Sequence, residues 1–121
     1  MSDPASPHRL SIRLDLPSGA RIGPGKVALL EAIGHSGSIS GAGRALKMSY
    51  RRAWMLVEDL NRHLGRPVVA TAAGGTGGGG ARLTEAGLAI VRAYRAVEQA
   101  SHAAAKPHLE ALEGVLHGPE E

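Results

Sequence analysis

The chain lacks several features on which common functional classes depend. It has no cysteine among its 121 residues, which excludes disulfide bonds and thiolate metal sites. Its six histidines never form a His-x3-His pair, so the spacing of a helical zinc site is missing too. No apolar run approaches the ~18 residues of a membrane-spanning helix, and the N-terminus lacks the basic-then-apolar pattern of a signal peptide. We therefore expect a cytoplasmic protein.

Aromatic side chains are scarce as well. There is no phenylalanine, and the aromatic residues are one tryptophan and two tyrosines, Trp54, Tyr50 and Tyr94. The core must therefore be built from Leu, Ile, Val and Ala. A chain of this length is expected to form one domain with a modest core, which favours additional burial through self-association.

No group of residues indicates catalysis. The chain has no cysteine nucleophile, no recognisable arrangement of Ser, His and Asp, and no close pair of carboxylates in a predicted cleft. We expect neither enzyme activity nor a bound cofactor or metal in this chain.

Positive charge is concentrated in one segment of the chain. The net charge is only +3, yet residues 35–82 contain seven Lys and Arg residues and two acidic ones. Residues 83–121 have the opposite balance, with three basic and six acidic residues. Such a basic segment is the electrostatic footprint of a domain that binds a phosphate backbone. The alternative is a solvated basic surface without a ligand.

The apolar pattern predicts a mainly α fold with a small β component. Leu and Ile alternate with polar residues over 10–16, which predicts a strand with one buried face. Residues 1–8 are polar and proline-rich, and we expect them to be disordered. Three helices are predicted next, over about 24–35, 39–46 and 50–64, with a tight turn between the second and the third.

A run of glycines follows these helices. Six of the seven residues at 74–80 are glycine, and the segments 68–71 and 81–83 beside them have strand character, which predicts a β-hairpin with a glycine tip. A P-loop is excluded because no Gly-Lys-Ser/Thr ends the run and a strand follows it. Helix, turn, helix and then a hairpin is the element order of a winged helix-turn-helix, which we place at residues 9–84.

A long helix is predicted after the hairpin. It covers residues 85–106 and is expected to end at Pro107, leaving a short amphipathic segment and an acidic tail over 107–121. An apolar stripe on this helix faces either the core or a second copy of the chain. We expect it to be a dimerisation helix, because the stripe extends further than a small domain needs. The stripe consists of Leu88, Val91, Tyr94 and Val97.

The third helix is the expected recognition helix. Such a helix presents its N-terminal side chains to base edges in the major groove of DNA. Ser49, Tyr50, Arg51 and Arg52 occupy its first turn, and arginine pairs bidentately with guanine or with phosphate. The alternative is a solvated pair of arginines and a serine that only caps the helix. Trp54 either stacks on a base or, as its helical phase favours, packs in the core.

Further DNA contacts are expected on both sides of this helix. Arg44 and Lys47 precede it and would fix the register of the protein on the DNA backbone. In the wing, glycine lets backbone amides approach a phosphate closely. The alternative there is a hairpin tip without a ligand. The expected wing contacts are Gly75, Thr76, Gly77 and Arg82.

Three stretches together resemble the N-terminal domain of the ModE-type molybdate-responsive regulators, which is related to the LysR-type winged helix. They are Ser36–Ser40, Met48–Trp54 and Gly74–Thr84, and Ala42, Ala45 and Leu46 between the first two belong to the same pattern. The resemblance covers about residues 10–105 and implies a dimeric DNA-binding domain whose long C-terminal helix carries the dimer contact. It also implies that Ser49–Arg52 and Gly75–Arg82 contact operator DNA.

The resemblance has a limit as well. Full members of that family carry C-terminal domains that bind molybdate or tungstate, and this chain has no room for them, so we expect no such sensing by it. The predicted function is a homodimeric DNA-binding transcriptional regulator of molybdenum metabolism. Two alternatives stay open: an interaction module that heterodimerises with a full-length regulator, and a small oxyanion bound at the wing or the dimer interface.

Overall fold

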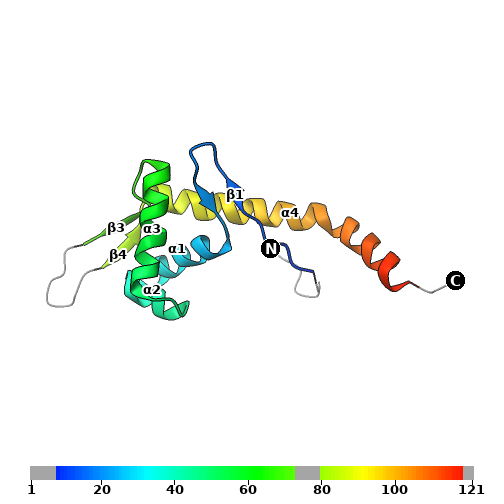
Figure 1. The fold of residues 1–121 in the computed structure, drawn as a ribbon, viewed down its shortest axis with the longest axis horizontal. Coiled ribbons are helices and arrows are strands. Elements are labelled where there is room, and N and C mark those ends of the chain that lie inside the picture. The colour runs from blue at the N-terminus through cyan, green and yellow to red at the C-terminus, as the bar shows by residue number, and fades with distance from the viewer. Residues whose placement is uncertain (1–7, 73–79, 119–121) are drawn as a thin grey trace.

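The structure, a computed structural model, describes residues 8–72 and 80–118. Figure 1 shows three helices grouped at one end of the molecule, a hairpin projecting from this group, and a long helix that passes behind it and extends beyond it. This arrangement confirms the predicted winged helix-turn-helix. The elements are β1 (Leu14–Asp15), β2 (Arg21–Ile22), α1 (Pro24–Ser36), α2 (Ile39–Ala45), α3 (Tyr50–Leu64), β3 (Val69–Thr71), β4 (Ala81–Leu83) and α4 (Glu85–His117).

Local sequence signals set the ends of the helices. The side-chain oxygens of Ser38, Ser49 and Thr84 each accept a hydrogen bond from the backbone N–H three residues later, at 2.9–3.1 Å. These bonds satisfy N–H groups that have no partner inside the helix. Gly37 and Gly65 end α1 and α3 in the left-handed region, with φ of 76° and 68°. The helix starts predicted for α2, α3 and α4 are confirmed.

An aliphatic core joins the helices to the base of the hairpin. Leu30 and Ile33 of α1, Val57 and Leu60 of α3, and Val68 just before β3 are all buried. Burying a side chain of this size stabilises the fold by about 1.5–3 kcal/mol relative to leaving it in water. The core therefore fixes α3 and the hairpin relative to α1. It is built mainly from aliphatic side chains, as the scarcity of aromatic residues predicts.

The N-terminal segment is less regular than predicted. Residues 10–16 alternate between half-buried and exposed as expected, but only Leu14–Asp15 forms a strand. It pairs antiparallel with Arg21–Ile22, a strand that was not predicted. The residues before β1 pack instead against α4, where the hydroxyl of Tyr94 donates to the carbonyl oxygen of Ile12 at 2.7 Å. Because these residues lie beside a helix, they have no neighbouring strand with which to form the backbone hydrogen bonds of a sheet.

The predicted end of the long helix at Pro107 is wrong. α4 is one helix of 33 residues with Pro107 inside it. Proline removes one N–H donor and crowds the preceding turn, which bends a helix rather than ending it when good helix formers lie on both sides. Figure 1 shows α4 curving along its C-terminal half. No helix in residues 8–72 and 80–118 is long and apolar enough to cross a membrane.

Gly87 provides a test of how α4 seats on the hairpin. A Cβ atom at this position would overlap the carbonyl oxygen of Val68, so Gly87→Ala forces the backbones apart. We expect it to lower the free energy of unfolding by about 1–3 kcal/mol, measured by urea unfolding followed by circular dichroism. Gly114→Ala is the matched control in the same helix, because a Cβ there meets nothing within 4 Å. It should raise stability by about 0.5–1 kcal/mol, and a similar loss in both variants would contradict the close contact.

Candidate nucleic-acid interface

Helix α3 separates its apolar and basic side chains onto opposite faces. Ala53, Val57 and Leu60 are buried in the core, whereas Arg51 and Arg52 are exposed. The apolar face can be buried in only one orientation, so the first turn of α3 points its two guanidinium groups into solvent. The cations of the first turn therefore lie on the side of α3 that faces away from the core.

The turn before α3 holds a second pair of cations. Lys47 adopts φ of 57°, a left-handed conformation that costs a residue with a Cβ about 1–2 kcal/mol. Its N–H donates to the carbonyl oxygen of Arg44 at 3.2 Å, and the N–H of Met48 donates to that of Gly43 at 2.9 Å. These bonds hold Arg44 and Lys47 together on the exposed side of the turn.

The structure places every described DNA-contact candidate at the surface. The seven side chains come from α2, the turn, α3 and β4, and all are exposed; they are Arg44, Lys47, Ser49, Tyr50, Arg51, Arg52 and Arg82. The remaining three candidates, Gly75, Thr76 and Gly77, lie outside the described residues. Contact of any of these residues with DNA stays a prediction.

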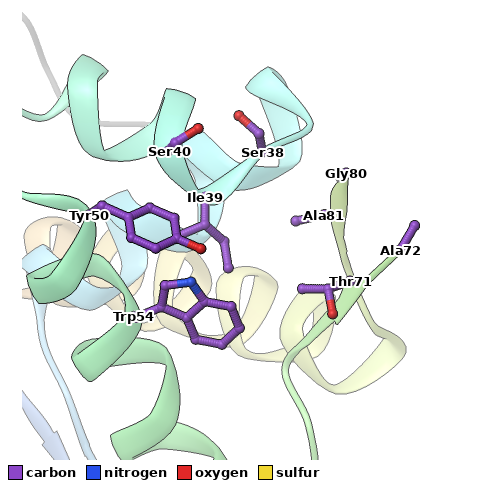
Figure 2. Close-up of a pocket in the computed structure, with 9 residues that line it drawn as sticks. All are labelled: Ser38, Ile39, Ser40, Tyr50, Trp54, Thr71, Ala72, Gly80 and Ala81. Atoms are coloured by element: carbon purple, nitrogen blue, oxygen red, sulfur yellow. The ribbon is translucent and has the colours of Figure 1, made fainter. Parts of the chain in front are cut away.

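A cleft lies between α3 and the wing strands β3 and β4 (Figure 2). Its volume is about 340 Å³, and its walls include Ile39 of α2, Tyr50 and Trp54 of α3, and Thr71 of β3. The rings of Tyr50 and Trp54 meet edge to face, with centroids 6.3 Å apart. Trp54 is half-buried: it packs against the core, as predicted, and also lines the cleft. This second role was not predicted from the sequence, because the opposite wall comes from β3 and β4.

Hydrogen bonds at its base hold the wing in place. The N–H of Ala81 donates to the carbonyl oxygen of Gly37 at the end of α1, at 2.8 Å. Thr84 donates from its N–H to the carbonyl oxygen of Val68 and from its hydroxyl to that of Pro67, at 3.0 and 2.7 Å. One bond therefore ties β4 to the end of α1, and the other two close the base of the hairpin just before α4 begins.

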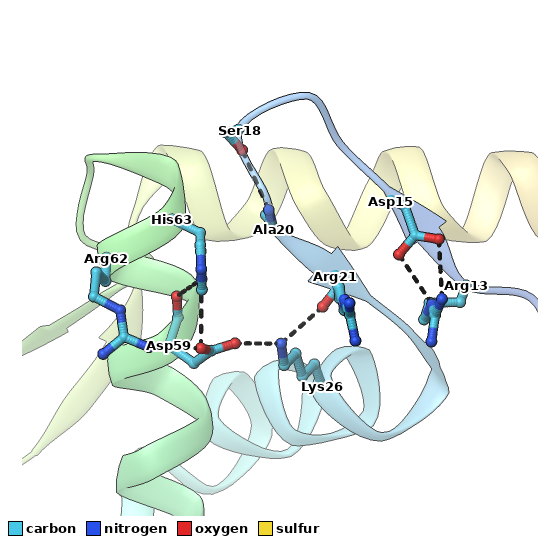
Figure 3. Close-up of polar contacts among 9 residues, drawn as sticks. All are labelled: Arg13, Asp15, Ser18, Ala20, Arg21, Lys26, Asp59, Arg62 and His63. Atoms are coloured by element: carbon cyan, nitrogen blue, oxygen red, sulfur yellow. Dashed lines mark hydrogen bonds and ion pairs between the residues drawn. The ribbon is translucent and has the colours of Figure 1, made fainter.

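Asp59 connects α3 to the N-terminal part of the domain (Figure 3). Its carboxylate accepts a hydrogen bond from Lys26 Nζ of α1 at 2.6 Å, and Lys26 also donates to the carbonyl oxygen of Arg21 at 2.8 Å. Arg62 and His63 approach the same carboxylate at 2.9 and 3.4 Å. The hydrogen bond from Lys26 is the main reason why the pKa of Asp59 lies below its usual range. The sequence offered no signal for this pair, whose members are 33 residues apart.

The buried position of Tyr94 shows that the predicted dimer surface is wrong at this residue. Its side chain is buried within the chain, so it is not available to a second copy, and burial raises the pKa of its hydroxyl. The spacing of three residues along a helix turns each successive side chain away from the previous one, so the stripe cannot lie on a single face. Val91 is half-buried against the same core, while Leu88 and Val97 remain exposed by 41% and 38%.

An ion-pair network holds α4 against α1. Arg95 donates to both carboxylate oxygens of Glu31, at 2.6 and 3.0 Å, and to Glu98 at 2.7 Å. The hydrogen bond to Arg95 is the main reason why the pKa of Glu31 is lowered, and the pKa of Arg95 is raised in turn. With the buried Tyr94, this network fixes the direction in which α4 leaves the domain.

The acid sensitivity of the fold tests the role of Asp59. Because the pKa of Asp59 is lower in the folded protein than in the unfolded chain, its ion pair stabilises the fold above pH about 4 and is lost as the pH falls through the folded-state pKa. We expect Asp59→Asn and Lys26→Met each to reduce the difference in free energy of unfolding between pH 7 and pH 3. Urea unfolding at both pH values measures it.

The matched control for this experiment is Arg62→Ala. Arg62 is the weakest of the charged partners that lower the pKa of Asp59, and its side chain is largely exposed. It should change the acid sensitivity less than Lys26→Met. If Lys26→Met leaves the pH dependence as it is in the parent, Lys26 is not the partner that stabilises the carboxylate.

The fold is a winged helix-turn-helix, and exposed arginines begin its third helix. The family model for "Bacterial regulatory helix-turn-helix protein, lysR family" matches residues 25–88, more than half of the chain. The chain therefore belongs to this family of bacterial regulatory proteins.

Its relatives include proteins named for molybdenum. The chain is 52% identical over 81 residues to the molybdenum-pterin-binding protein MopB of Rhodobacter capsulatus, an alignment that covers 67% of this chain and 30% of that protein. It is 39% identical over 110 residues to MopA of the same organism, covering 91% and 40%. The DNA-binding transcriptional dual regulator ModE of Escherichia coli is 37% identical over 76 residues, covering 63% and 29%. The chain thus spans less than half the length of these relatives.

A solved structure shows the same fold. The full-length LysR-type regulator LysG of Corynebacterium glutamicum with bound effector Arg superposes with a TM-score of 0.53 at 30% sequence identity. The match covers 74% of this chain and 29% of that protein. The similarity is therefore to a part of a longer regulator.

Proposed function

We propose that this protein is a DNA-binding transcriptional regulator of molybdenum metabolism that acts as a homodimer in the bacterial cytoplasm. The observation that carries the proposal is the first turn of α3, where Arg51 and Arg52 are exposed on a helix whose other face is buried. Membership of a family of bacterial regulatory helix-turn-helix proteins supports DNA as the partner. The link to molybdenum rests on the names of the relatives.

In this proposal α3 enters the major groove with its N-terminus leading. Arg51 and Arg52 pair with base edges or with phosphates, which the planar guanidinium contacts through two parallel hydrogen bonds. Arg44 and Lys47 approach the backbone from the turn and Arg82 from the wing, and they position the protein without reading sequence.

The proposed dimer forms through α4. Figure 1 shows the C-terminal half of this helix extending beyond the rest of the domain. Leu112, Val115 and Leu116 are exposed in this half, and Leu88 and Val97 are exposed closer to the domain. Two-fold pairing would place two recognition helices on successive major grooves of a palindromic site. Neither the structure nor the relatives favour the alternative, a heterodimer with a full-length regulator.

Removing the two guanidinium groups tests the recognition helix. Duplexes selected from random DNA, with and without molybdate, first supply a bound sequence. Arg51→Ala together with Arg52→Ala should weaken binding to it by about 1–3 kcal/mol for each base-reading contact. The dependence of affinity on salt should also become shallower, by about one unit of logarithmic slope for each phosphate that is no longer neutralised by an arginine. Fluorescence anisotropy over a series of salt concentrations measures both quantities.

Arg13→Ala is the matched control for this experiment. Arg13 is also exposed, but it lies just before β1 and pairs with Asp15 at 2.9 Å, away from α3 and the wing. It should leave affinity and salt dependence close to those of the parent. Equal decreases in affinity in the control and in the double variant would mean that binding follows overall charge and not the recognition helix.

A charge on α4 tests the dimer. Val97 is exposed within the chain, so Val97→Glu should leave the monomer folded but place a carboxylate in the proposed interface, where burial without a partner is unfavourable. We expect sedimentation velocity to show a dimer for the parent and a monomer for the variant, with unchanged circular dichroism. A parent that sediments as a monomer at all concentrations would refute the proposed dimer.

A further inference from the structure

In the proposed complex, the cleft between α3 and the wing would face the DNA backbone between a major groove and the adjacent minor groove. If α3 lies in the major groove and the wing lies over the adjacent minor groove, one sugar–phosphate strand must pass between them, because that strand is the wall between the two grooves. The cleft opens between these two elements (Figure 2). Its position therefore matches the path of a single strand of the duplex backbone.

The walls of the cleft combine apolar surface with neutral donors. The ring of Trp54 and the side chain of Ile39 supply apolar surface, and Figure 2 shows the hydroxyl of Tyr50 directed into the open space. Ser38 and Ser40 lie at the end of the cleft formed by α2. Among the residues that the structure describes, neither the indole N–H of Trp54 nor the hydroxyl of Tyr50 is committed to a protein acceptor, so each can serve a ligand in the cleft.

The electrostatic surroundings favour an anion. None of the described residues that line the cleft is acidic. Arg51 and Arg52 follow Tyr50 in the first turn of α3, and Arg82 follows Ala81, the residue of β4 that lines the opposite wall. A phosphodiester offers only acceptor oxygens to such donors, while the adjoining deoxyribose offers an apolar face to the indole.

We propose that this cleft seats one deoxyribose-phosphate unit of the strand that passes between α3 and the wing. Trp54 covers the sugar, and the hydroxyl of Tyr50 and the indole N–H donate to the phosphate oxygens. The site rests on the proposed DNA-binding function and adds to it a contact that is made by neutral side chains and does not depend on base sequence. The site also gives Trp54 a direct part in binding. Its predicted position in the core would by itself give it only a structural role.

The single tryptophan of the chain reports on the site without any substitution. In the parent protein, saturation with the selected duplex should lower the acrylamide quenching constant of Trp54 at least threefold, since a seated sugar excludes the quencher. Anisotropy on the same samples records binding independently. If the duplex binds and the quenching constant stays the same, the cleft is not occupied and this inference fails while the proposed function stands. If no duplex binds, both fail.

Tyrosine substitutions separate a phosphate contact from base reading. Tyr50→Phe removes one hydroxyl from an exposed side chain and should weaken binding about tenfold, equally for selected and unrelated duplexes. The salt slope should stay at the parent value, because the substitution removes no cation. Tyr94→Phe, which removes the only other tyrosine hydroxyl, is the matched control and should alter stability but not affinity.

A modified duplex tests the phosphate itself. A methylphosphonate at the phosphate between the α3 and wing contacts removes one acceptor oxygen and its charge. It should weaken binding of the parent about tenfold and weaken binding of Tyr50→Phe by a smaller factor, because only the indole N–H still donates to that phosphate in the variant. Weaker binding of Tyr50→Phe to the selected duplex alone, or a full effect of the methylphosphonate on Tyr50→Phe at every phosphate tested, would assign Tyr50 to base reading and overturn the site.

Discussion

Burial of the apolar face of α3 in the shared core is the interaction on which the rest of the structure depends. Val57 and Leu60 pack with the aliphatic side chains of α1, and this packing leaves only one face of α3 for solvent. The same packing orients Arg51 and Arg52 outward. The core therefore sets the direction of the cations, although none of them contributes to it.

Ion pairs between helices add to the way the core positions α3 and α4. The pair Lys26–Asp59 ties the middle of α3 to α1, and the pair Glu31–Arg95 ties α4 to α1. Each is partly exposed, so its main effect is to select one geometry and not to supply most of the stability. Helix α3, the wing strand β4 and α4 all contact α1, which therefore fixes their relative positions and the width of the cleft beside Trp54.

Short-range signals made much of the fold predictable. Ser49 and Gly65 bracket α3, and Thr84 starts α4, because capping bonds and left-handed glycines act within a few residues. The prediction failed at Pro107, where helix formers on both sides outweigh the proline, and in the N-terminal segment, where a distant helix decides the packing. Pro107 did not end α4, and the extended N-terminal segment packed on α4 instead of extending β1, since a helix surface and not a strand lies beside it.

The sequence by itself determined the order of the helices and of the wing hairpin, the basic character of residues 35–82 and the start of α3 at its serine cap, because periodicity, capping and charge are properties of neighbouring residues. Only the tertiary structure decided that Tyr94 is a core residue, that Asp59 meets Lys26, and that Tyr50 and Trp54 face Thr71 across a cleft. These relations join residues from separate elements. They exist only once the packing of the core has brought those elements together.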